Sequence, residues 1–126
     1  MDLPQSPHAE LSEDETRVQV SLPGTGATFE LDAAGLDHLI DRLGALRAGM
    51  RNQHPSAWPR RGFVDAIYNP PWYSEPELLQ GNSLLHIRHP GFGWLHFSIP
   101  KPAAAKLAEF LEDQASATEE TPQFKH

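Results

Sequence analysis

Residues 84–99 constrain the fold of this chain more than any other stretch. Apolar and polar residues alternate on both sides of a turn rich in proline and glycine, a pattern typical of a β-hairpin. A hairpin centred on this turn pairs Leu85 with Phe97 and Ile87 with Leu95, because successive side chains point to opposite faces of a strand. The sequence therefore predicts a hairpin with one wholly apolar face.

The other face of this hairpin combines histidine, arginine and tryptophan. The same register sets His86 opposite His96 and Arg88 opposite Trp94. A monomer does not normally expose a large apolar side chain such as Trp94 among polar neighbours, so we expect this face to be covered. The cover is an aromatic loop of the same chain, a second copy of the chain or a partner protein.

An earlier hairpin and a helix precede this region. Residues 17–31 alternate in the same way around Pro-Gly-Thr-Gly, which predicts a second hairpin with an apolar face. The predicted pairs are Leu22 with Ala27, Val20 with Phe29, and Val18 with Leu31. Residues 33–48 carry apolar side chains at helical spacing, and Asp32 stands where an N-cap is expected.

The region between the hairpins is less regular. We expect a strand from Phe63 to Tyr68, oriented so that Asp65 points away from the core, because a buried carboxylate without a partner is costly. Residues 69–82 begin with Asn-Pro-Pro-Trp-Tyr, and proline cannot donate a hydrogen bond within a central strand. That segment is therefore predicted to be an extended aromatic loop. A second amphipathic helix is expected over residues 102–113.

Together these elements predict an α+β fold. Their order is β-β-α-β-β-β-α, which favours one antiparallel sheet of about five strands with the two amphipathic helices on one face. Residues 1–15 and 114–126 are polar with few apolar positions, so we expect a disordered acidic arm and a disordered tail. The folded part is then a single domain over residues 16–113.

Composition restricts the classes of function. The chain contains no cysteine, which excludes disulfides, thiolate metal sites and a thiol nucleophile. Its 17 acidic residues against 10 lysines and arginines give a formal charge of −7, so we expect neither nucleic acid nor a membrane surface as a partner. The sequence does not begin with a basic and apolar leader, and we expect a cytoplasmic protein.

The cross-strand histidines suggest one chemical hypothesis. The Cβ atoms of directly opposed residues lie about 5 Å apart, so the imidazoles of His86 and His96 can share a metal ion. A zinc site needs a third or fourth donor, which a carboxylate such as Asp65 or Glu30 would have to supply. Solvated or hydrogen-bonded histidines are the alternative, and no other cofactor is expected.

Binding is better supported by the sequence than catalysis. Ser74, Ser83 and Ser98 lack the surroundings of an activated nucleophile, and the spacing indicates no set of serine, histidine and carboxylate. Tryptophan, tyrosine and arginine are enriched where proteins bind one another. The predicted binding residues are Arg88, Trp94, His86, His96, Trp72 and Tyr73.

We therefore expect a non-catalytic interaction module, of an accessory, chaperone-like or immunity type. It would bind a partner protein and form a homodimer through the open face of its sheet. The alternative is a small-ligand or metal-binding protein that uses His86 and His96.

Overall fold

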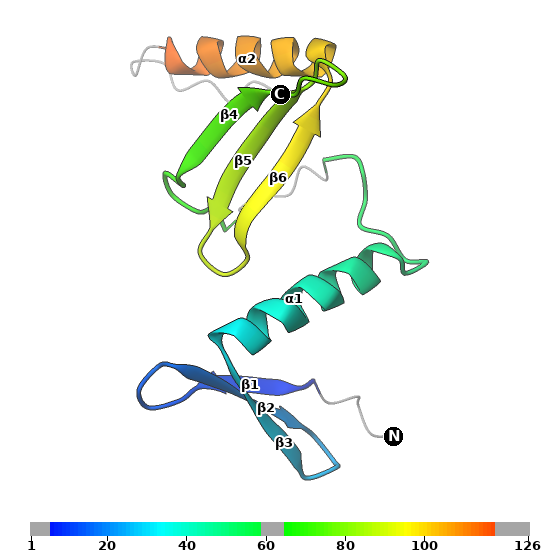
Figure 1. Ribbon diagram of the computed structural model, residues 1–126, viewed down its shortest axis with the longest axis vertical. Helices are drawn as coiled ribbons and strands as arrows, with labels where there is room; N and C mark the ends of the chain where they lie inside the picture. Colours follow the sequence, from blue (N-terminus) through cyan, green and yellow to red (C-terminus); the bar gives the residue numbers. More distant parts are fainter. Residues whose placement is uncertain (1–5, 59–64, 118–126) are drawn as a thin grey trace. The chain divides into compact units, whose positions relative to one another are not determined.

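Both halves of the chain have the same order of elements, three strands followed by a helix (Figure 1). The computed structural model describes residues 6–58 and 65–117 and divides the chain into two compact units, Met1–Val64 and Asp65–His126. Each unit contains a three-stranded antiparallel sheet, in the order β1-β2-β3 in the first and β4-β5-β6 in the second.

The first unit confirms the earlier hairpin and its helix. It consists of β1 (His8–Leu11), β2 (Arg17–Leu22), β3 (Ala27–Asp32) and α1 (Ala33–Ala48). The β2 and β3 pairs follow the predicted register: Leu22 with Ala27, Val20 with Phe29, and Val18 with Leu31. Helix α1 has the predicted bounds, and the Asp32 carboxylate accepts a hydrogen bond from the Gly35 amide at 2.9 Å.

Strand β1 lies in the segment for which the sequence predicts a disordered arm. His8–Leu11 pairs with β2, and Ala9 lies opposite Val20. A segment with so few apolar residues can form an edge strand because β2 already supplies backbone hydrogen-bond partners and an apolar face. Residues 1–5 of the predicted arm and 118–126 of the predicted tail lie outside the described residues.

The second unit confirms the hairpin over residues 84–99. It consists of β4 (Trp72–Pro76), β5 (Ser83–His89), β6 (Gly93–Ile99) and α2 (Lys101–Ala115). All four predicted pairs are present: Leu85 with Phe97, Ile87 with Leu95, His86 with His96, and Arg88 with Trp94. Helix α2 is also confirmed, and it extends slightly beyond the predicted residues 102–113 at both ends.

The third strand of this sheet is not the predicted one. Phe63 and Val64 lie outside the described residues, and residues 65–68 are not in a strand. The strand instead forms within the predicted aromatic loop, as β4 along the edge of the sheet beside β5. Proline is tolerated in an edge strand, where an amide can face away from the ladder, and Pro76 is the last residue of β4.

The prediction of one sheet of about five strands is therefore corrected to two sheets of three strands. The two helices therefore do not share one sheet. Helix α1 directly follows β3, and α2 follows β6 after a single residue, Pro100. The division into two sheets could not be predicted from the sequence. Each hairpin pairs with an edge strand, and the segments that form these edge strands lack the residue pattern typical of a strand.

The described residues of each unit do not enclose a core. None of the described residues is buried, and large apolar side chains are exposed in both units, among them Phe29 and Leu43 in the first, and Trp72 and Phe110 in the second. The side chains of a unit considered alone are at least as exposed to solvent as they are in the whole chain. In the described parts, no helix has the length and apolar character needed to cross a membrane.

Candidate functional site

The candidate site is one face of the second sheet, which we call the histidine face. Alternation along the three strands gives this face a shared set of residues in register: Tyr73 and Glu75 from β4, His86 and Arg88 from β5, and Trp94 and His96 from β6. The opposite face, which we call the apolar face, includes Trp72, Leu85, Ile87, Leu95 and Phe97.

A chain of hydrogen bonds crosses all three strands at the centre of the histidine face. Nδ1 of His86 lies 2.8 Å from Nδ1 of His96, and Nε2 of His86 lies 2.7 Å from Oε2 of Glu75. The Tyr73 ring stacks on the His86 ring at a centroid distance of 6.1 Å. His86 is therefore held on both ring nitrogens and on one ring face, and its side chain is only 17% exposed.

The geometry determines which ring nitrogens carry a proton in this chain of hydrogen bonds. The carboxylate of Glu75 only accepts, so Nε2 of His86 donates to it. The contact between the two Nδ1 atoms holds one proton, because one nitrogen must donate and the other must accept. The neutral arrangement therefore has His86 as the Nε2–H tautomer and His96 as the Nδ1–H tautomer.

Arg88 and Trp94 form the exposed part of the same face. Trp94 is 46% exposed, and Arg88 lies opposite it on β5 and is also exposed. The described residues include no carboxylate in a salt bridge with Arg88. A flat aromatic ring and a free guanidinium thus lie side by side, next to the ordered histidines.

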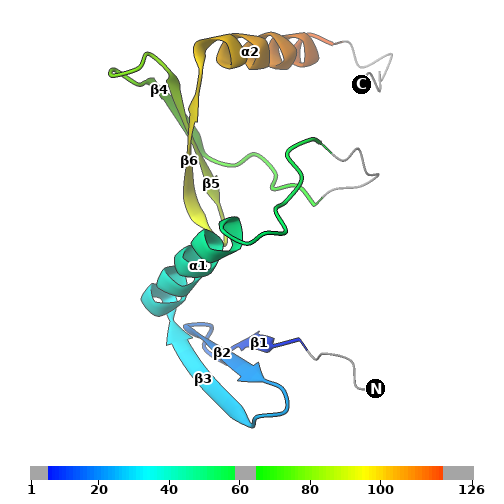
Figure 2. The ribbon, with the colours of Figure 1, turned by 90° about the vertical axis from the view of Figure 1, so that its right-hand side faces the viewer.

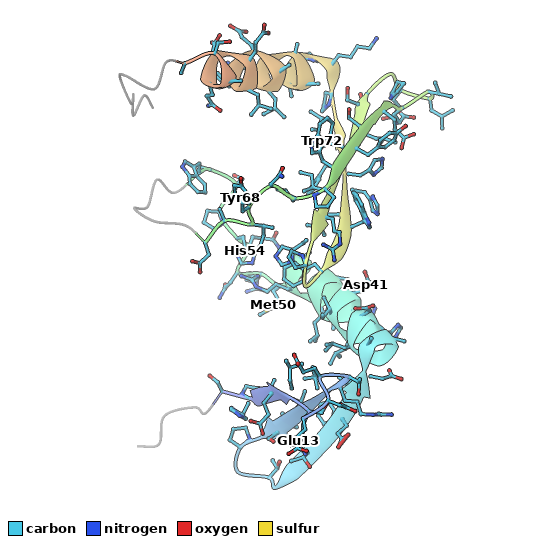
Figure 3. The ribbon with its side chains drawn as sticks, turned by 90° about the vertical axis from the view of Figure 1, so that its left-hand side faces the viewer. Glu13, Asp41, Met50, His54, Tyr68 and Trp72 are labelled. Atoms are coloured by element: carbon cyan, nitrogen blue, oxygen red, sulfur yellow. The ribbon has the colours of Figure 1, made fainter. Side chains whose placement is uncertain are left out.

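The structure separates two residues that the sequence groups together. Tyr73 lies on the histidine face, beside His86, whereas Trp72 lies on the apolar face, because neighbouring residues of a strand point in opposite directions. Figure 3 shows Trp72 on the side of the sheet toward which α2 extends. The predicted binding residues Arg88, Trp94, His86, His96 and Tyr73 therefore share a surface, and Trp72 does not.

Glu75 is the member of the candidate site that could not be identified from the sequence. The sequence suggests Asp65 or Glu30 as the carboxylate near the histidines and predicts residues 69–82, which contain Glu75, to be a loop. The feature of the sequence that could have identified it is the spacing of Tyr73 and Glu75, which are two residues apart and therefore lie on one face of a strand.

The arrangement lacks the donor set of a metal centre. Among the described residues, no group of three or more histidines and carboxylates could hold a metal ion. Glu75 binds the nitrogen of His86 that points away from His96, so it cannot join both histidines on one ion. Glu75 instead lies where a carboxylate would accept a hydrogen bond from a metal-binding histidine without binding the metal ion itself.

The hydrogen-bond chain also lacks a nucleophile. A carboxylate followed by a histidine is the supporting half of a serine hydrolase triad. Within the described residues, no serine or threonine hydroxyl is hydrogen-bonded to His86 or His96. The hydroxyl of Ser98, on the same face of β6, accepts from the Asn82 amide at 3.1 Å. Among the described residues, the chain of hydrogen bonds holds His86 between Glu75 and His96 and so orders this face.

Comparison with known proteins leaves the site to be interpreted from its own geometry. No protein-family model, no curated protein and no solved structure matches this chain.

Proposed function

We propose that the chain is a non-catalytic interaction module that binds a partner protein through the histidine face of its second unit. This class includes accessory, chaperone-like and immunity-type proteins. The supporting residues are the ordered ring pair His86 and Tyr73, the exposed ring of Trp94 and the guanidinium of Arg88. Tryptophan, tyrosine and arginine are the residue types enriched at the energetic centres of protein interfaces.

The observation that carries the proposal is a contrast within the chain. The first unit has the same strand order, and its equivalent central row consists of Glu10, Gln19 and Glu30, where the second unit has tyrosine and two histidines. Its next row consists of His8, Ser21 and Thr28, where the second unit pairs arginine with tryptophan. The scaffold therefore does not require aromatic rings and histidines at these positions.

The chemistry of the face indicates the kind of surface it would bind. The ring of Trp94 offers a flat apolar area, and the guanidinium of Arg88 offers a planar fork of donors that suits a carboxylate. Tyr73 and His86 extend the aromatic area across the sheet. A protein surface with a protruding apolar side chain next to an aspartate or glutamate complements this arrangement.

The experiment compares proteins retained from a lysate of the source cells by three immobilised chains. One is the wild type, one carries Arg88→Ser with Trp94→Thr, and one carries Ser21→Ala with Thr28→Ala. The first double variant gives the second unit the residue pair of the first unit, and the second double variant alters the equivalent positions of the first unit as a matched control.

We expect a protein that the wild type and the control retain and that the Arg88→Ser and Trp94→Thr variant loses. Circular dichroism of all three chains shows whether the sheets are intact. Retention of the same proteins by all three folded chains would contradict the proposal.

A further inference from the structure

The apolar face of the second unit carries a groove that the proposed function does not use. The groove has a volume of about 420 Å³. Its two main walls are the sheet, which contributes Trp72, Leu85 and Ile87, and helix α2, which contributes Leu107 and Leu111; the segment before β4 adds Asn69 and Pro70. Almost all of its lining is apolar, so water is a poor occupant.

The connection between the sheet and α2 keeps the groove open. Only Pro100, in an extended conformation, separates the end of β6 from the start of α2. Figure 2 shows the helix leaving the end of the sheet and running away from it, instead of lying along the strands. The sheet and the helix therefore form two walls at an angle, and neither covers the other.

We propose that the groove is filled by α2 of a second copy of this chain, lying antiparallel to the resident α2 in a two-fold symmetric dimer. In such a dimer each helix packs on the apolar face of the partner sheet and against the partner helix. The contact is self-complementary, because the same stripe of the helix both lines one groove and fills the other.

The exposed apolar area agrees with this occupant. Residues of the groove and its rim remain substantially exposed: Trp72 66%, Phe97 47%, Leu107 39%, Phe110 52% and Leu111 55%. Covering these side chains in both copies would bury roughly 1,000 Å², which reaches the lower limit for a specific interface. The histidine face has less apolar surface, so it suits a second copy less well than the groove does.

The charges of α2 favour the antiparallel direction. At 100° per residue, Lys101 and Glu112 lie about 20° apart around the helix axis, on the same flank of the apolar stripe. Lys101 is at the start of the helix and Glu112 is near its end. A perpendicular two-fold axis brings the same flanks together with opposite ends aligned, so each Lys101 meets the Glu112 of the other copy.

The first test is the mass in solution by light scattering over a range of concentrations. We expect a dimer for the wild type and a monomer for Leu111→Asp, with dissociation at least about 100-fold easier because the symmetric contact loses two leucines. Leu78→Asp is the matched control, since Leu78 is 91% exposed and does not line the groove. It is expected to remain a dimer.

The second test uses exposed charges, which do not endanger folding. Lys101→Glu and Glu112→Lys are each expected to weaken the dimer about 3- to 10-fold, and the double variant is expected to recover the wild-type dissociation constant. A wild type that is monomeric at all concentrations, or a dimer unaffected by Leu111→Asp, would overturn the proposal. Failure of the double variant to recover would overturn the antiparallel arrangement.

This inference does not depend on the proposed function. The Arg88→Ser and Trp94→Thr variant alters the opposite face, so it is expected to lose the partner protein and remain a dimer. If it becomes a monomer, the two copies meet through the histidine face, as predicted from the sequence, and the groove proposal is wrong.

Discussion

The sheets of the two units share a strand order but differ on their polar faces. In the first unit the row across β1, β2 and β3 is Glu10, Gln19 and Glu30, which are solvent-exposed. In the second unit the equivalent row is Tyr73, His86 and His96, connected by ring stacking and a hydrogen bond of 2.8 Å. The apolar faces of the two sheets, by contrast, follow the same alternation.

This difference distinguishes the residues that the fold requires from those that it does not require. The apolar alternation and the turns recur in both units, so they define the scaffold. The hydrogen-bonded histidine pair and the exposed tryptophan occur on only one of the two polar faces, although the first unit also carries His8 and Arg17 on its polar face. The first unit therefore serves as an internal control for every substitution on the second.

The largest expected effect on stability tests whether the apolar faces are equivalent. Ile87→Asp should lower the free energy of unfolding by about 2–3 kcal/mol, and Val20→Asp by about 1–2 kcal/mol. Ile87 lies opposite Trp72 and Leu95, whereas one neighbour of Val20 is the small Ala9, so less apolar contact is lost. Urea unfolding measures both values. An equal or larger loss for Val20→Asp would contradict this ranking.

A smaller effect is expected from the carboxylate that orders the histidine face. Glu75→Ala should cost about 1 kcal/mol, because it removes the acceptor from Nε2 of His86. Glu10→Ala, at an exposed carboxylate of the first unit, should cost about 0.5 kcal/mol or less.

Nitrogen NMR checks the same arrangement directly. In mildly alkaline solution it should show His86 as the Nε2–H tautomer and His96 as the Nδ1–H tautomer. In Glu75→Ala, the fixed tautomer of His86 should be lost. The opposite tautomers in the wild type would contradict this arrangement of hydrogen bonds.

The smallest effect concerns the turn between β1 and β2. The Thr16 hydroxyl, the Ser12 hydroxyl and the Thr16 amide donate to the Asp14 carboxylate and hold its pKa below the ordinary value of 3.8. A carboxyl with a lowered pKa in the folded state stabilises the fold above its ordinary pKa, and this contribution disappears as the pH falls through the lowered value.

NMR of the Thr16 amide should therefore change below pH 3.8 in the wild type, while Asp14→Ala should already show the changed signal at neutral pH. Signals from the second unit should not follow the titration of Asp14. A Thr16 signal that is the same in both chains at all pH values would show that Asp14 does not order this turn.

The hairpins could be predicted residue by residue because two local signals agree. A turn of proline and glycine fixes the centre, and the period of two then fixes the register, as in the pair His86 and His96. Helix α1 was predictable for a similar reason, since its apolar spacing begins directly after the N-cap Asp32.

The edge strands could not be predicted because their partners determine them. Strand β1 has few apolar residues, and β4 is flanked by Pro70 and Pro71 and ends in Pro76. Few apolar residues and neighbouring prolines both argue against a strand when a segment is considered alone. Each segment nevertheless pairs with an existing hairpin. The position of Glu75 depended on β4, so the third member of the hydrogen-bond chain was missed as well.

We propose that the histidine face binds a protein and that the equivalent face of the first unit does not. Once a partner is captured, the most direct measurement is its dissociation constant for wild type, Arg88→Ser with Trp94→Thr, and Ser21→Ala with Thr28→Ala. We expect binding at least about 30-fold weaker for the first variant, as for the loss of an interface hot spot, and unchanged binding for the second. Equal dissociation constants for all three folded chains would contradict this proposal.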